Sequence, residues 1–168
     1  LTSEMASLRE ELSGVQGVKE EKAALEAASR EVARVIESGG LIFVFGCGHS
    51  HLPGLDAFYR AGGLANVSPM LDTDLMLHNG AIKSSRMEKM SGIASEIFRR
   101  YTPTSKDMIF IFSASGKNTV PVEMAIEAKK LGVFTACITN LNYSRAVTSR
   151  HPDGKRLFEV CATVIDNC

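Results

Sequence analysis

The chain has 168 residues, 45% of them hydrophobic, and carries 19 basic and 19 acidic side chains. That length supports one buried core, and the balanced charge leaves no net field to attract nucleic acid or an anionic membrane. No apolar run approaches the roughly 20 residues that span a bilayer, and the first residues lack the layout of a signal peptide. We therefore expect a cytoplasmic protein with no nucleic-acid or membrane partner.

The first part of the chain predicts helices ahead of any strand. Its apolar residues recur at helical spacing in two groups interrupted by Gly14 and Gly17, which predicts two helices. We expect one domain over residues 1–168, with a helical extension of about 1–38 and an αβ core of about 39–168. The first residue is not Met and the last residues follow a strand-like run, so we expect the natural chain to extend further.

Two continuous apolar runs, 41–45 and 108–112, are typical of strands buried on both faces of a parallel sheet. A helix with Pro53 in its first turn follows the first run and is expected to end at Gly62-Gly63. A short extended piece near residues 66–68 comes next. These elements make one strand-helix-strand unit.

Residues 71–84 show no clean period, and a capping box, Ser85-Arg86-Met87-Glu88, follows them. It predicts a helix from Ser85 to about Tyr101 in which the Glu88 side chain bonds back to the cap amide. Without that bond, Glu88 would be free for chemistry.

The second half of the chain continues the alternation. A helix with Pro121 in its first turn ends at Gly132, and a strand over 133–138 follows. A polar stretch, 139–155, leads to a short helix and a last strand, 162–166. The pattern predicts an α/β fold, a three-layer α/β/α sandwich of the flavodoxin or Rossmann type with a five-stranded, mostly parallel sheet.

Two loops of small and polar residues follow the two buried runs, over residues 45–51 and 113–119. Parallel strands bring such loops to the carboxyl edge of the sheet, where open α/β folds bind ligands. Small residues, hydroxyls and the positive end of a helix together suit a phosphate group. The first loop lacks the third glycine of a dinucleotide fingerprint, and neither loop has the phosphate-loop lysine pattern.

The four cysteines are widely spaced, without the paired spacing of a zinc site or a dense disulfide framework. Three are expected to be inert core thiols. Cys47 lies inside the first loop near a helix N-terminus, where a thiolate would be stabilised. It is either a small loop residue or a nucleophile. We expect no metal and no cofactor.

Gly46-Cys47-Gly48-His49-Ser50 and Ser113-Ala114-Ser115-Gly116 resemble the two loop motifs of the sugar isomerase (SIS) domain family, whose members bind phosphosugars. The resemblance covers nearly the whole chain, with Asn118 where the family more often has Ser or Thr. It implies a phosphate site formed by Gly48, Ser50, Ser113, Ser115, Gly116, Lys117, Asn118 and Thr119. Ordinary turn and cap chemistry is the other interpretation of these serines.

With Phe58-Tyr59-Arg60-Ala61-Gly62-Gly63, Lys83-Ser84-Ser85 and Ser149-Arg150-His151, the chain looks like a bacterial subfamily of uncharacterised SIS-domain sugar isomerase-like proteins. More distantly it is similar to phosphoheptose isomerases and N-acetylmuramic acid 6-phosphate etherases. The phosphoheptose isomerases have an acidic residue where this chain has Arg60, and take a histidine from a helix beyond the last strand.

The resemblance implies an aldose-ketose isomerase that moves protons through an enediol without a metal. The candidate catalytic residues are Glu88, His51 and His49, and weaker candidates are Asp56, His78 and His151. Arg145 and Arg150 are placed to reach a sugar acid or a second subunit, or are simply solvated. The alternatives are a sugar-phosphate sensor that does not catalyse and an etherase-type lyase. We expect a homodimer or homotetramer.

Overall fold

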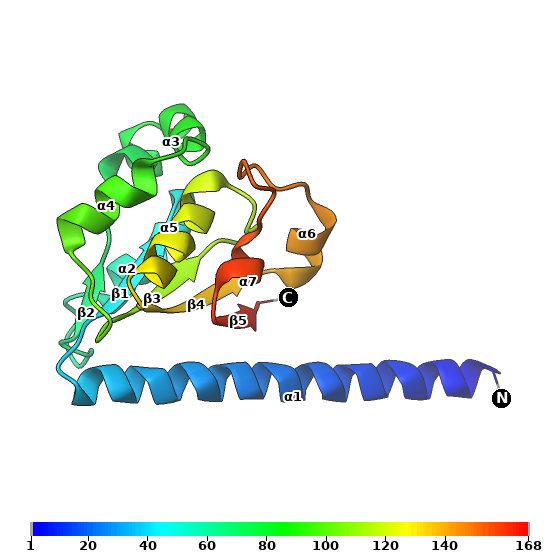
Figure 1. Ribbon diagram of the computed structural model, residues 1–168. Helices are drawn as coiled ribbons and strands as arrows, with labels where there is room; N and C mark the ends of the chain where they lie inside the picture. The colour runs from blue at the N-terminus through cyan, green and yellow to red at the C-terminus, as the bar shows by residue number, and fades with distance from the viewer. Residues whose placement is uncertain (1, 168) are drawn as a thin grey trace.

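The computed structural model describes the backbone of residues 2–167 and the side chains of residues 18–167 (Figure 1). The helices are α1 (Thr2–Glu37), α2 (Leu52–Ala57), α3 (Ala81–Met87), α4 (Ile93–Tyr101), α5 (Thr119–Lys130), α6 (Leu141–Ala146) and α7 (Leu157–Val160). The strands are β1 (Ile42–Gly46), β2 (Val67–Pro69), β3 (Met108–Phe112), β4 (Phe134–Thr139) and β5 (Thr163–Asp166). Short 3-10 turns are η1 (Gly48–His51), η2 (Thr73–Leu75) and η3 (Leu77–Asn79).

The strands form a five-stranded sheet in the order β2-β1-β3-β4-β5, and each neighbouring pair is parallel. The predicted α/β fold with a mostly parallel sheet is therefore confirmed. Strands β1 and β3 are neighbours inside the sheet, and both are apolar on both faces.

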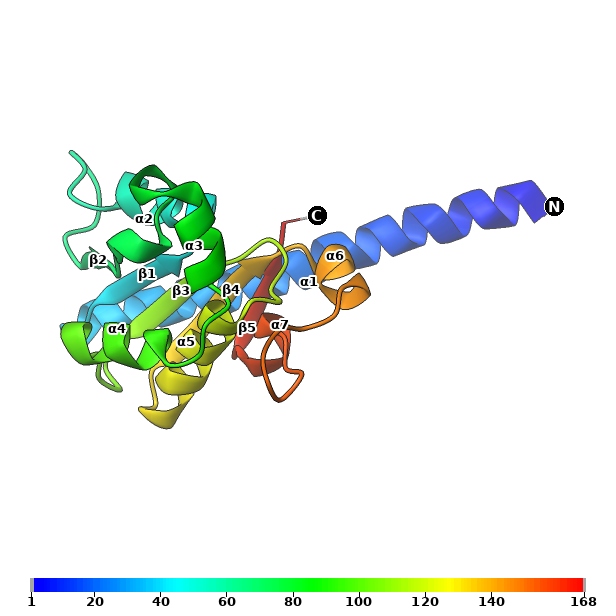
Figure 2. The ribbon, with the colours of Figure 1, turned by 90° about the horizontal axis from the view of Figure 1, so that it is seen from above.

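Helices cover both faces of the sheet. The larger core lies between the sheet and α4, α5 and α7, and includes Phe43 at 2% exposure and Ile109 at 0%. On the opposite face, Val35 of α1 packs against Ile42 and Met108. Seen from above, α4 and α5 lie on the near side of the sheet and α1 on the far side (Figure 2). The result is the predicted three-layer sandwich.

The N-terminal segment is one continuous helix, α1, so the prediction of two helices was wrong. Gly14 and Gly17 lie inside it, and a glycine there costs only about 1 kcal/mol relative to Ala. The neighbouring Ala, Glu, Lys and Leu residues favour the helix enough to continue it. The N-terminal part of α1 extends beyond the sheet (Figure 1). Among the described helices, none has the length and apolar character needed to cross a membrane.

Two of the predicted helices have different boundaries in the structure. Helix α2 is shorter than expected, because Phe58 is extended and Tyr59 adopts a left-handed φ of 51°. The helix expected over 85–101 is divided into α3 and α4, and Gly92 with a φ of 90° precedes α4. The division places Glu88 after the end of α3 rather than inside a first helical turn.

Asp107 fixes the amino edge of the sheet. Its carboxylate accepts hydrogen bonds from Leu41 N at 2.7 Å, Thr104 N at 2.6 Å and Thr104 Oγ1 at 2.9 Å. The chain passes so closely here that a Cβ at Gly40 would lie 2.4 Å from the Lys106 carbonyl oxygen. These contacts set where β1 and β3 begin, and therefore where the loops at their other ends lie.

The sheet face on the α1 side is only partly covered. An apolar groove of about 360 Å³ lies along it, lined by residues of α1, α2 and the sheet, among them Val44, Phe110 and Phe112. The phosphate-binding loops predicted from the sequence are not among its lining residues.

Candidate functional site

The two loops leave the sheet side by side. Gly46 at the end of β1 pairs with Phe112 at the end of β3, so the segments that follow begin at neighbouring positions of the same edge. A Cβ at Gly46 would lie 2.0 Å from the Ser50 carbonyl oxygen, and therefore only glycine allows the first loop to fold back on its strand. The two loops therefore begin at adjacent positions of the carboxyl edge, where the sequence places them.

The first loop is a tight turn built on its own backbone. Ser50 N donates to Cys47 O at 3.1 Å, and the Ser50 side chain is half-buried. His51 is 6% exposed, and its Nδ1 donates to Gly48 O. This hydrogen bond leaves Nε2 as the nitrogen with a lone pair. His49 is exposed on the same turn.

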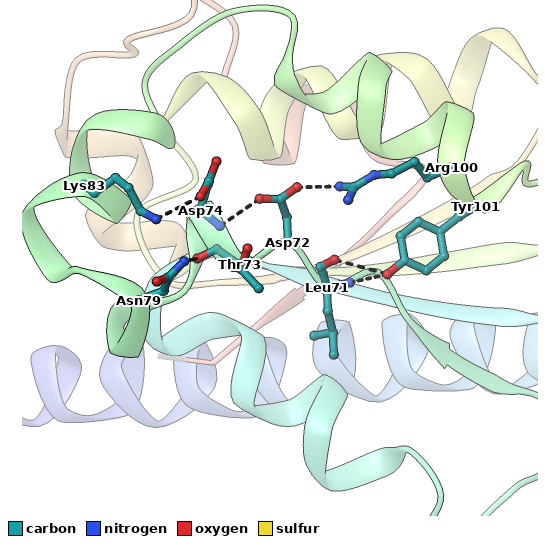
Figure 3. Close-up of polar contacts among 8 residues, drawn as sticks. All are labelled: Leu71, Asp72, Thr73, Asp74, Asn79, Lys83, Arg100 and Tyr101. Carbon is teal, nitrogen blue, oxygen red and sulfur yellow. Dashed lines mark hydrogen bonds and ion pairs between the residues drawn. The ribbon is translucent and has the colours of Figure 1, made fainter.

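His78 joins the first loop from a distant part of the chain, with its ring centroid 5.9 Å from that of His51. Polar contacts hold its segment. Asp72 pairs with Arg100, and the Tyr101 hydroxyl accepts from Leu71 N at 2.8 Å. Figure 3 shows these contacts together with those of Thr73, Asp74, Asn79 and Lys83.

The second loop presents unused backbone donors. Gly116, with a φ of 57°, donates its amide to Ser113 Oγ at 3.2 Å. The amides of Ser115, Lys117 and Asn118 donate to no protein acceptor within residues 2–167. They lie just before α5, whose N-terminus carries partial positive charge. An anion there would find several donors and no carboxylate of the loop itself.

Two other predicted residues of this loop have protein partners. The hydroxyl of Thr119 donates to Arg150 O at 3.1 Å, and the Thr119 side chain is 1% exposed. The Asn118 side chain is buried and accepts a hydrogen bond from Arg150 Nη1 at 2.8 Å. The segment between α6 and α7 therefore closes one side of the second loop.

Glu88 lies between the two loops. The Asn118 side chain of the second loop is close enough to lower the pKa of its carboxyl, and the same carboxyl is close enough to Cys47 to raise the pKa of the thiol. The predicted capping box was wrong, because Ser85 lies inside α3 and Glu88 follows the helix. The Glu88 carboxylate is therefore not engaged in the predicted capping bond to the Ser85 amide.

Partial burial of Glu88 raises the pKa of its carboxyl above the usual value. Desolvation is the largest cause, since it disfavours the charged form. Smaller effects in the other direction come from Asn118, Lys89, Arg150 and Lys117. A carboxyl with a raised pKa is a stronger base than a solvated one, as proton abstraction requires.

Cys47 is no candidate nucleophile in this structure. The thiol is 8% exposed, and burial raises its pKa well above the usual value, with Glu88 and Asp72 raising it further. Only the thiolate is strongly nucleophilic. Cys47 therefore serves as a small apolar residue under the first loop.

The remaining candidates have local structural partners. Asp56 forms an exposed ion pair with Arg60 on α2. His151 accepts from Asp153 N at 3.2 Å within a turn. Lys117 Nζ lies 5.6 Å from the centroid of the Tyr143 ring. Among the side chains that the structure describes, no group of three His, Cys, Asp or Glu residues is placed to hold a metal ion.

Residues 6–140 match the family model described as the SIS domain, and both loops lie inside that match. The chain belongs to the SIS domain family. Arg150 lies outside the matched range, on the C-terminal side of residue 140. The UPF0309 protein of Geobacillus thermodenitrificans is 45% identical over 150 residues, which are 89% of this chain and 60% of that protein. The UPF0309 protein of Thermoanaerobacter pseudethanolicus is 47% identical over 132 residues, 79% of this chain and 53% of that protein.

The chain thus spans about 60% of the length of the curated relatives that it matches. Among solved structures, phosphoheptose isomerase from Neisseria gonorrhoeae has a TM-score of 0.57 to this SIS domain at 14% identity. The match covers 95% of this chain and 85% of that one. At this identity the likeness shows a shared fold.

Proposed function

We propose that this SIS domain holds a sugar by its phosphate and interconverts aldose and ketose by proton transfer. The observation that carries the proposal is the position of Glu88, whose backbone carbonyl accepts from Val120 N of α5 at 3.1 Å. Its carboxyl is close enough to Asn118 for that side chain to affect its pKa, and close enough to Cys47 to raise the pKa of the thiol. A base between two phosphate-binding loops is adjacent to the carbons of a sugar anchored there.

The phosphate is assigned to the edge where the two loops meet. The hydroxyls of Ser50, Ser113 and Ser115 and the unused amides of the second loop are its donors. Gly48 and Gly116 shape the loops through their left-handed φ angles, and Thr119 does so through its bond to the backbone of the α6–α7 segment.

In this mechanism Glu88 removes the proton from C2 of the aldose. The electrons of the C2–H bond form the C1–C2 double bond, and the carbonyl oxygen takes up a proton, giving an enediol. The hydroxyl at C2 then loses its proton to become the ketone, and C1 takes up a proton. We assign the transfer of protons to and from the two substrate oxygens to His49 and to His51, whose ring lies against that of His78.

Proton NMR in deuterated water tests the reaction. A panel of pentose, hexose, heptose and amino-sugar phosphates is incubated with the protein, and the C2 proton is followed. Exchange with formation of the ketose supports an isomerase. Exchange with loss of a substituent at C3 would mean a lyase, and line broadening without exchange a sensor; either result contradicts isomerisation.

Ser115→Ala tests the phosphate site separately. Losing one hydrogen bond to a charged group should weaken sugar-phosphate binding by roughly 1–3 kcal/mol. Ser105→Ala is the matched control, because Ser105 is exposed and precedes β3 at the opposite edge of the sheet. Equal affinity of the two variants, measured by calorimetry, would remove Ser115 from the site. The expected homodimer or homotetramer stays a prediction.

A further inference from the structure

The segment between α6 and α7 is fastened to the second loop by backbone bonds. Arg150 N donates to Lys117 O at 2.8 Å, and Arg150 O accepts from Thr119 Oγ1 at 3.1 Å. Further along, Leu157 N donates to Gly116 O at 2.8 Å. In Figure 1 this orange-to-red segment lies beside the N-terminal end of α5. The backbone of Arg150 is thus held at the start of α5.

The Arg150 side chain keeps its positive charge uncompensated by a direct ion pair. Its Nη1 donates to the neutral amide oxygen of Asn118 at 2.8 Å. By contrast, the guanidinium groups of Arg100 and Arg156 each pair with a carboxylate. Among the described side chains, those of residues 18–167, Arg150 has no such pair, and one of its five N–H donors is engaged. The residue is exposed, so the other donors are accessible.

Asn118 connects this cation to the proposed base. Its Oδ1 accepts from Arg150 Nη1 at 2.8 Å, and the same side chain lowers the pKa of Glu88. Asn118 itself is 8% exposed, so the hydrogen bond from Arg150 is made to a buried amide. A serine or threonine at this position has a single hydroxyl and lacks the separate oxygen and NH₂ group of an amide.

We propose that Arg150 is an anion-binding residue of this site. Its free N–H donors hold the substrate phosphate, and Asn118 positions the guanidinium group through the bond that it accepts from Nη1. Guanidinium donors match phosphate oxygens in pairs, and a backbone-anchored arginine loses little freedom on binding. The inference rests on the proposed function, because it concerns the same phosphate. It adds a cation from beyond the residues of the family match, 6–140.

The test compares phosphate affinity of wild type, Arg150→Ala and Arg150→Lys, with inorganic phosphate as the first probe and the sugar-phosphate panel as the second. We expect Arg150→Ala to bind about 10- to 100-fold more weakly and Arg150→Lys to retain part of the affinity. Arg145→Ala is the matched control, because Arg145 is also exposed but lies over the Phe158 ring, 5.9 Å from its centroid.

Salt dependence separates a charge contact from a structural role. If Arg150 binds the anion, sodium chloride should weaken phosphate binding more steeply in wild type than in Arg150→Ala. Wild-type affinity in Arg150→Ala, or equal losses in the alanine and lysine variants with unchanged salt dependence, would overturn the inference and leave the proposed function standing. Wild type that binds neither phosphate nor any sugar phosphate would overturn both.

Discussion

The Val120 backbone amide donates to the carbonyl oxygen of Glu88 at 3.1 Å. This bond joins the end of α3 to the start of α5, the helix that follows the second loop. The backbone therefore fixes the position of the proposed base, and Asn118 is close enough to its carboxyl to lower the pKa. Replacing the carboxylate by an isosteric amide should leave this arrangement intact.

Glu88→Gln is expected to abolish C2-proton exchange while sugar-phosphate binding persists. A positioned general base contributes roughly 100- to 10,000-fold to the rate, and Gln cannot accept a proton at neutral pH. The exchange rate by NMR and the affinity by calorimetry measure the two effects. In wild type, the rate should rise with pH as Glu88 ionises, and that limb should be absent in the variant.

The matched control is Glu96→Gln, because Glu96 is exposed on α4 in a surface ion pair with Arg99 at 2.8 Å. This variant should exchange the C2 proton at the wild-type rate. Unchanged exchange in Glu88→Gln would remove Glu88 from the mechanism. A loss of binding in Glu88→Gln equal to its loss of rate would assign the carboxylate to substrate binding instead.

The raised pKa of Glu88 also predicts a pH dependence of stability. The folded protein holds this proton more tightly than the unfolded chain, where the usual value is 4.5. The stability that this carboxyl contributes is therefore complete below that value and is lost as pH rises through the folded-state pKa. Wild type should lose stability relative to Glu88→Gln as pH rises from about 4 to 7. Urea midpoints of both proteins across this range measure the difference, and a difference independent of pH would contradict the raised pKa.

Gly116→Ala should destabilise the protein and damage the second loop. The residue has a φ of 57°, and a Cβ there would lie 2.8 Å from Ser144 Oγ and 3.2 Å from Thr139 Oγ1. Backbone strain and crowding together should cost roughly 2–4 kcal/mol of unfolding free energy. Gly62→Ala controls for strain alone, with a φ of 76° and open space around the added Cβ, and should cost about 1 kcal/mol. Equal losses in urea denaturation would show that the loop accommodates the added methyl.

Asp107→Asn should destabilise the fold without changing phosphate affinity. The variant replaces an acceptor oxygen by an NH₂ group, which then faces the amide of Leu41 or of Thr104. An unpaired buried donor costs about 1–3 kcal/mol. Asp153→Asn, at an exposed position, is the control. The expected result is a lower urea midpoint with an unchanged phosphate dissociation constant, because Asp107 lies at the opposite end of β3 from the loops. Wild-type stability would show that these hydrogen bonds contribute little.

Long apolar runs were the best guide to the fold, because a strand buried on both faces requires them. The run 108–112 is β3 with the predicted boundaries, and the loops after β1 and β3 lie together as expected. Helix boundaries were less predictable. A four-residue capping pattern at Ser85 was outweighed by an earlier helix start at Ala81.

One missed element had a local signal. Helix α6 lies in the stretch that was predicted only to be polar, and Asn140 begins it as a cap, its Oδ1 accepting from Tyr143 N at 2.7 Å. Asparagine before a helix is a strong start signal. For Arg150 the sequence left open a sugar acid, a second subunit or solvent, since nothing near it in the sequence connects it to Lys117 or Asn118.

The sequence by itself determined the parallel sheet, the two small-residue loops and the family resemblance, because these depend on apolar runs and on motifs a few residues long. Only the tertiary structure decided that Glu88 stands between the loops and that Arg150 is fastened to the second one. Both placements depend on hydrogen bonds between residues about 30 positions apart. Such contacts form when helices pack on the sheet, and local sequence patterns do not encode them.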